Sequence, residues 1–169
     1  MRRLVVAAVA GMLLLPLLIV RLTALGVWHV QSTATPPRWE RALARLAFNA
    51  SVARRAPRLS NPISPTAGEL LAGMKVYRDD CAGCHGDYGR RSSWGTEDFY
   101  PRVPQFALEP PHKPDWQLYW IVKHGVRYSG MGAWDGQVPD STVWQVVTFL
   151  SRLDSLPPSV EAEWKKKQP

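Results

Sequence analysis

Apolar and amphipathic patterns divide the chain into four segments, of which the first is the most apolar. Residues 4–28 contain one charged residue, Arg21. At about 1.5 Å per residue, a helix of this length spans the hydrocarbon core of a bilayer. We therefore predict an uncleaved transmembrane anchor within residues 1–30. The alternative is a signal peptide cleaved near Ser32-Thr33-Ala34, and in both cases the rest of the chain is exported.

The second segment, residues 31–65, combines a basic helical pattern with a proline-rich linker. Trp39, Leu43 and Leu46 recur at steps of four and three, which places them on one face of a helix, while arginines fall on another face. Such a helix suits anionic lipid headgroups. It equally suits packing on the following domain or on a partner subunit, and the sequence leaves these uses open.

Residues 66–158 carry the signals of three further helices. Each begins at a capping residue, and the three are Thr66 with Glu69 in a capping box, Asp115 and Asp140. The first helix continues to the cysteines, the second ends at His124 before a glycine, and the third ends near Leu153. Since no segment alternates as a strand does, the domain is predicted to be mostly α. Residues 159–169, which include three consecutive lysines, are predicted to be a solvated charged tail.

Charge is concentrated at the N-terminal side of the chain. Residues 1–58 hold nine Arg and one Glu, a net charge of +8, whereas residues 59–169 hold twelve basic and thirteen acidic residues. The total of +7 therefore belongs to the first two segments. Because no recognition motif accompanies these arginines, we predict no nucleic-acid partner.

The segment Cys81-Ala82-Gly83-Cys84-His85 is a C-x-x-C-H motif, typical of covalent attachment of a c-type haem. Two thiols on one helical turn can add to the two vinyl groups of a porphyrin, and the imidazole of His85 then faces the iron. A structural zinc site needs two more ligands at matching spacing, and a thioredoxin-like pair needs a βαβ context. Neither accompanies these two cysteines, which are the only ones in the chain. The predicted cofactor is one covalent haem c.

These residues resemble the small class I cytochromes c of bacteria over most of residues 66–156. In that family a glycine and an aromatic residue ahead of the first haem cysteine cross the last helix, and Gly73 and Tyr77 stand at that spacing. Phe149 and Leu150 look like their partners. The resemblance implies a cytochrome c-like fold of three to four helices around the haem, preceded by the membrane helix and the basic amphipathic helix.

The resemblance also implies how the iron is held. The family has a proline whose carbonyl accepts a hydrogen bond from the proximal imidazole, and Pro104 is the first candidate here, with Pro101 as the alternative. Met131, in Ser129-Gly130-Met131-Gly132-Ala133-Trp134, corresponds to the second axial ligand, although Gly132 stands where the family usually has proline. The predicted iron ligands are thus His85 and Met131, and ligation by His112 or His124 is the alternative to Met131.

Ligands at both axial positions indicate electron transfer rather than catalysis. We therefore predict a single-haem electron carrier, or a subunit of a respiratory complex, that has no catalytic residues and no small-molecule substrate. The prediction places it on the cytoplasmic membrane as a single-pass protein, with its haem domain in the periplasm or another extracytoplasmic space. Its partners would be an oxidase, a reductase or a dehydrogenase. A haem enzyme or gas sensor with a displaceable Met131, and an assembly subunit whose haem mainly supports folding, remain as alternatives.

Overall fold

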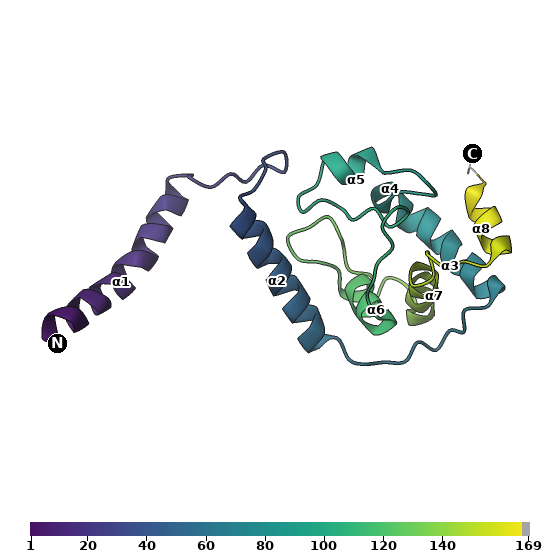
Figure 1. Ribbon diagram of the computed structural model, residues 1–169, viewed down its shortest axis with the longest axis horizontal. Coiled ribbons are helices and arrows are strands. Elements are labelled where there is room, and N and C mark those ends of the chain that lie inside the picture. The colour runs from purple at the N-terminus through teal and green to yellow at the C-terminus, as the bar shows by residue number, and fades with distance from the viewer. Residues whose placement is uncertain (167–169) are drawn as a thin grey trace. The chain divides into compact units, whose positions relative to one another are not determined.

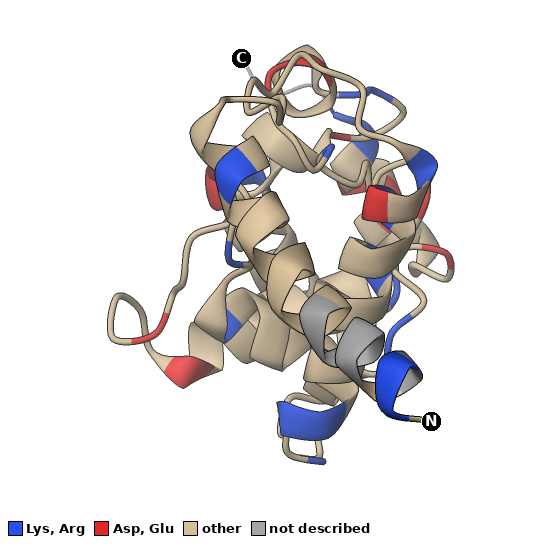
Figure 2. Ribbon diagram, turned by 90° about the vertical axis from the view of Figure 1, so that its left-hand side faces the viewer, with Lys and Arg blue, Asp and Glu red and all other residues tan. Residues whose placement is uncertain are grey.

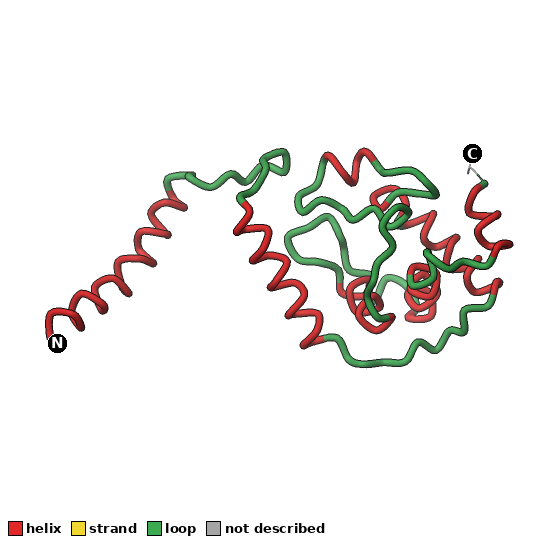
Figure 3. Tube along the Cα trace, in the orientation of Figure 1, coloured by secondary structure: helices red, strands yellow, loops and turns green. Residues whose placement is uncertain are grey.

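The structure, a computed structural model, describes residues 1–166, without the side chains of residue 4 and residues 6–10. Helices and loops make up the described residues, and no β-strand is found among them (Figures 1 and 3). An isolated bridge pairs Asp87 with Arg90. The helices are α1 (Arg2–Ala24), α2 (Arg38–Arg55), α3 (Ala67–Asp80), α4 (Ala82–His85), α5 (Ser93–Glu97), α6 (Asp115–His124), α7 (Asp140–Leu150) and α8 (Pro158–Lys165).

The chain divides into two compact units, Met1–Pro36 and Pro37–Pro169. The first unit is formed by α1, which contains Pro16 and ends where the backbone N–H of Leu25 donates to the carbonyl of Arg21. Beyond it, Trp28 Nε1 donates to Thr23 Oγ1 at 2.9 Å. The second unit contains the remaining seven helices of the described residues.

The structure corrects the prediction of a membrane anchor. Within the part of the chain that the structure describes, no helix combines the length and the apolar character needed to cross a membrane. The predicted transmembrane helix, and with it the single-pass location, is therefore not upheld. The side chains at residues 4 and 6–10, which the prediction also used, lie outside those described.

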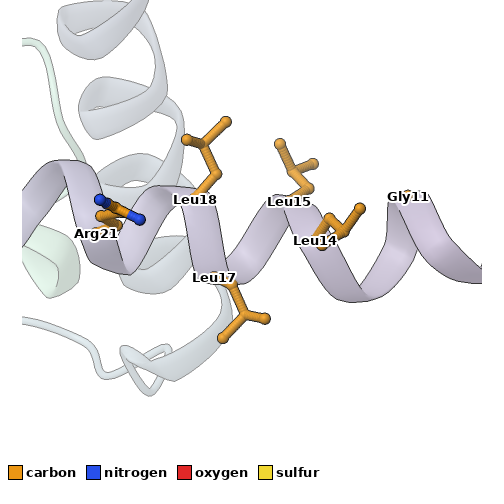
Figure 4. A pocket seen from close by; sticks show the side chains of 6 residues that line it. All are labelled: Gly11, Leu14, Leu15, Leu17, Leu18 and Arg21. Atoms are coloured by element: carbon orange, nitrogen blue, oxygen red, sulfur yellow. The ribbon is translucent and has the colours of Figure 1, made fainter.

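A shallow pocket on α1 belongs to the first unit alone. Its lining residues are Gly11, Leu14, Leu15, Leu17, Leu18 and Arg21 (Figure 4). In the figure, Leu17 points away from the side of the helix on which Leu15 and Leu18 lie. Because these side chains do not converge on a common centre, the pocket supports no binding site.

The second unit is built around the crossing of α3 and α7. Gly73 makes this crossing close, because a Cβ atom added there would lie 2.2 Å from the carbonyl oxygen of Gln145. Tyr77 and Phe149, both fully buried, pack next to it with ring centroids 5.6 Å apart. The contact predicted between the first and last helices of the haem domain is therefore present. On the other side of α7, Tyr119 of α6 stacks on Trp144 at 4.0 Å.

The basic helix α2 packs on the haem domain through its C-terminal half. Val52 is buried, and Lys113, just before α6, donates to Asn49 Oδ1 at 3.1 Å. The N-terminal half of α2 leaves its apolar face in solvent, since Trp39 and Leu43 are each about 60 % exposed. Of the two uses that the sequence left open, the structure shows packing on the domain, and lipid binding stays a prediction.

The C-terminal residues differ from the predicted solvated tail. Residues 158–165 form α8, and both Val160 and Trp164 on this helix are buried. The tail was predicted from its lysines, of which Lys165 and Lys166 are exposed while the other face of the helix is buried. Residues 167–169 lie outside the described residues.

Figure 2 marks Lys and Arg in blue and Asp and Glu in red, and residues of opposite charge pair at several places in the second unit. Lys75 pairs with Asp79 on α3, and Lys165 pairs with Glu161 on α8, each at a spacing of four residues. Between helices, Lys123 Nζ lies 2.8 Å from Asp140 Oδ1 and so links the end of α6 to the start of α7. This hydrogen bond lowers the pKa of Asp140 below its usual range.

Candidate haem site

The cysteine motif lies where α3 continues into the short helix α4. Thr66 caps α3 by accepting a hydrogen bond from the backbone N–H of Glu69 at 3.3 Å, as the capping box predicted. The backbone N–H groups of Cys84 and His85 both donate to the carbonyl of Cys81, at 3.1 and 2.9 Å. This single turn brings the two thiols and the imidazole of the motif together.

Both cysteines are free and half-buried. Burial is the main cause that raises the pKa of the Cys81 thiol to about 12, and the nearby Asp80 adds to it. Thiol–disulfide exchange requires a thiolate, so this environment does not favour the thioredoxin-like alternative. Nor does the part of the chain described here contain a group of three or more His, Cys, Asp or Glu side chains arranged to hold a metal ion such as zinc.

The turn that follows the motif is fixed by Gly86 and Tyr77. Gly86 has φ +81°, and an added Cβ would lie 2.5 Å from the carbonyl oxygen of Arg90. Both the backbone conformation and this short distance therefore exclude a side chain at this position. The hydroxyl of Tyr77 donates to the carbonyl of Gly86 at 2.7 Å. Burial raises the pKa of Tyr77, which keeps its hydroxyl a donor.

The imidazole of His85 is held from two directions. Its Nδ1 lies 2.8 Å from the carbonyl oxygen of Pro104, and the ring of Phe106 stacks against it at 4.4 Å and 5°. Burial lowers the pKa of His85, opposed by the hydrogen bond to Pro104. A neutral imidazole whose Nδ1 proton is donated to a carbonyl keeps its Nε2 lone pair free for a metal. Pro104, the first candidate, makes this contact, and no hydrogen bond of His85 to Pro101 is found among the described residues.

Gln105 is a residue of the site that the sequence analysis missed. Its side chain is 8 % exposed. Its Oε1 accepts from the backbone N–H of Ser92 at 2.8 Å, and its Nε2 donates to the carbonyls of Cys84 and Val103, both at 3.0 Å. Gln105 thus connects the second haem cysteine to the loop that carries Pro104. The sequence feature that could have identified Gln105 is its polar side chain directly after the predicted Pro104.

Met131 lies half-buried in a loop whose backbone is held by hydrogen bonds. The N–H of Val126 donates to the carbonyl of Met131 at 3.0 Å, and the N–H of Met131 donates to Ser129 Oγ at 3.1 Å. Gly125, with φ +67°, lets the loop approach, because an added Cβ would lie 2.7 Å from the carbonyl carbon of Gly132. The loop is therefore fixed although Gly132 replaces the usual proline.

The side chain of Met131 packs against the edge of the hydrophobic core, as do Cys81 and Phe106. His112 and His124, the alternative ligands, are both exposed. The surroundings of the three side chains thus favour Met131 as the partner of His85. The role of this pair at the iron stays a prediction.

The donor set fits a c-type haem. Two free thiols lie one helical turn apart, a neutral imidazole is held next to them, and a half-buried thioether lies at the edge of the same core. The chemistry of these groups matches two thioether links and two axial iron ligands.

Comparison with known proteins agrees with this geometry. Residues 68–150 match the family model described as cytochrome c oxidase, cbb3-type, subunit III. The chain contains a c-type cytochrome domain. Its cofactor is covalent haem c, and the cytochrome domain is an electron-transfer unit. No curated protein and no solved structure matches the chain.

The match covers part of the second unit. It begins at the second residue of α3 and ends with α7. Both α2 and α8 therefore lie outside the matched cytochrome domain, although each packs on it through buried residues.

Proposed function

We propose that the chain is a single-haem electron carrier, or an electron-donating subunit of a respiratory oxidase, with His85 and Met131 as the axial ligands. The contact between His85 Nδ1 and the Pro104 carbonyl carries this proposal. It fixes which nitrogen bears the proton and how the ring is oriented, and it leaves Nε2 to bind iron. Cys81 and Cys84 hold the haem covalently.

The haem supplies a one-electron couple, and the surrounding residues determine how it is used. An imidazole and a thioether are both neutral ligands, and this pair favours the reduced state and raises the reduction potential. A hydrogen bond to the Pro104 carbonyl orients the His85 ring and another holds the backbone of Met131, so neither ligand needs to move when the electron arrives. Two occupied axial positions leave no place for a substrate, and we therefore propose no catalytic residue.

The partners proposed for the cytochrome domain are redox proteins of a respiratory chain. The match to a subunit of a cbb3-type oxidase supports a terminal oxidase among them. A cytochrome c domain also supports an extracytoplasmic location, because covalent haem attachment is typical of exported proteins.

An optical titration with carbon monoxide tests the axial ligands. For the haem-loaded wild type we expect low-spin spectra in both oxidation states and no change when the gas is added to the reduced protein. Met131→Ala opens one axial position, so this variant should bind the gas and transfer electrons more slowly to an oxidase.

Met74→Leu is the matched control. Met74 is a buried core residue of α3, and exchange for a residue of similar volume should cost less than about 1.5 kcal/mol of stability. Its spectra should match the wild type. A wild-type protein that binds carbon monoxide would instead show a displaceable ligand and would favour a haem enzyme or gas sensor.

A further inference from the structure

Helix α8 lies beyond the matched cytochrome domain and packs next to the haem motif. Its Trp164 is 4 % exposed and contacts Phe149 and Tyr77 edge to face, with ring centroids 5.3 and 6.4 Å apart. Tyr77 is the residue that holds the carbonyl of Gly86. The C-terminal helix therefore shares an aromatic cluster with the turn that follows His85.

Two side-chain hydrogen bonds join α8 to that turn directly. Trp164 Nε1 donates to Asp87 Oδ1 at 2.7 Å, and the hydroxyl of Tyr88 donates to Glu161 Oε1 at 3.1 Å. Asp87 and Tyr88 are the second and third residues after His85. The turn is thus tied to α8 at two consecutive positions.

Arg78 completes the link from the attachment helix. Its Nη2 donates to the carbonyl of Trp164 and, at 3.0 Å, to that of Lys166. Its Nε lies 3.5 Å from Asp87 Oδ1, in a side chain that is 6 % exposed. Within the described residues this buried Nε has no hydrogen-bond partner, so its interaction with Asp87 is one of charge. Asp87 thereby balances a buried cation while it accepts the Trp164 hydrogen bond.

These contacts affect His85 because a single residue separates it from Asp87. The one intervening residue is Gly86, at φ +81°, and glycine allows more backbone rotation than any other residue. The Tyr77 hydroxyl lies 3.3 Å from the carbonyl of His85, before this hinge, and 2.7 Å from the carbonyl of Gly86, after it. The side chain of Asp87, directly after the hinge, is held by α8. Release of Asp87 from α8 would remove the side-chain anchor beyond the hinge and leave the turn to the Tyr77 hydroxyl and the Asp87–Arg90 bridge.

We propose that α8 acts as a strap, a helix that holds the turn after His85 (residues 86–88) in place. Trp164 and Asp87 are then positioning residues for His85. The inference rests on the proposed ligation of iron by His85 and extends it to residues outside the matched cytochrome domain. Loss of the strap should loosen His85 and admit water to its side of the haem. A wetter site stabilises the oxidised state, so the reduction potential should fall.

Trp164→Phe in the full-length, haem-loaded protein tests the strap. Phenylalanine keeps an aromatic ring in the cluster but has no Nε1–H to donate. We expect a lower reduction potential and about a tenfold larger fraction of reduced protein that binds carbon monoxide, which is the equilibrium change for one lost hydrogen bond of about 1.4 kcal/mol. Haem content and far-ultraviolet circular dichroism should stay unchanged.

Glu163→Gln is the matched control on the same helix. Glu163 pairs with Lys166 at the surface and makes no contact with the turn among the described hydrogen bonds. This variant should keep the wild-type potential. If Trp164→Phe lowers the melting temperature but leaves the potential and the gas binding at their wild-type values, α8 has a structural role only and the proposal is overturned.

A second variant keeps the test informative if Trp164→Phe folds poorly. Tyr88→Phe removes the hydrogen bond to Glu161 and keeps the ring, and it should shift the potential in the same direction by a smaller amount. No shift in either variant would also overturn the proposal. Failure of the proposed function shows in the wild type, as gas binding, whereas failure of the strap shows only as the absence of a difference between variant and wild type.

Discussion

Gln105 makes three hydrogen bonds from one buried side chain, to Ser92, Cys84 and Val103. In Gln105→Ala, the N–H of Ser92 and the carbonyl of Cys84 lose partners in a half-buried place. One lost hydrogen bond costs about 1 kcal/mol, and a buried unsatisfied group costs more. We expect the free energy of unfolding of the haem-bound protein to fall by about 2–3 kcal/mol, measured by denaturant titration.

Gln137→Ala is the control for this prediction. Gln137 is exposed, and its amide donates to the carbonyl of Ala133. Substitution there should change stability by less than about 0.5 kcal/mol. Equal unfolding midpoints for the two variants would show that the Gln105 bonds are replaced by water.

At this scale the sequence predicts the haem-binding residues and Pro104, which contacts His85, and misses Gln105 and Asp87. Cys81, Cys84 and His85 stand in a motif of fixed spacing, so their proximity follows from one helical turn. Gln105 and Asp87 act through contacts 21 and 77 residues away along the chain, with Cys84 and Trp164. No local pattern encodes such pairs, because they depend on how the loops and α8 fold back.

At the scale of the helices, the crossing of α3 and α7 depends on the absence of a side chain at Gly73. In Gly73→Ala the new Cβ would lie 2.2 Å from the carbonyl oxygen of Gln145 and 2.9 Å from Phe149 Cβ. The two helices must then move apart. We expect a loss of about 1–3 kcal/mol in the free energy of unfolding, as for other overpacked cores, together with a lower melting temperature.

Gly68→Ala is the matched variant on the same helix. An added Cβ there meets nothing within 4 Å. Since alanine favours a helix by up to about 1 kcal/mol over glycine, this variant should be as stable as the wild type or more stable. If the two variants melt alike, close approach at Gly73 does not limit stability.

The helices that sequence could predict are those with strong end signals. The structure confirms the start of α3 at the Thr66 cap and the end of α6 at the glycine after His124. It corrects the end of the third helix, because α7 stops at Leu150 rather than near Leu153. The predicted caps Asp115 and Asp140 are instead the first residues of their helices and make no side-chain cap hydrogen bond. Helix α8 was missed because the run of lysines at 165–167 dominates the C-terminal sequence, whereas the helix has only two buried residues, Val160 and Trp164. In α1 the apolar pattern predicted a membrane helix that the described residues do not uphold.

At the scale of the whole molecule, the matched cytochrome domain is short for a core that must be stable by itself. Several core-edge side chains, among them Cys81, Phe106 and Met131, are only partly buried by protein atoms. A covalent porphyrin would cover this edge and cross-link α4 to it. The fold and the cofactor are therefore expected to depend on each other.

The double variant Cys81→Ser, Cys84→Ser, prepared free of haem, tests this dependence. It loses the buried porphyrin surface and both axial links, and we expect a loss of at least about 3 kcal/mol. For a domain of this size that corresponds to a fall of about 12–24 °C in melting temperature, with lower helix content by circular dichroism. Gly83→Ala, between the two cysteines, is the control, because an added Cβ meets nothing within 4 Å and both thiols remain. A haem-free variant that melts like this control would contradict the expectation, because the protein core alone would then account for the stability of the fold.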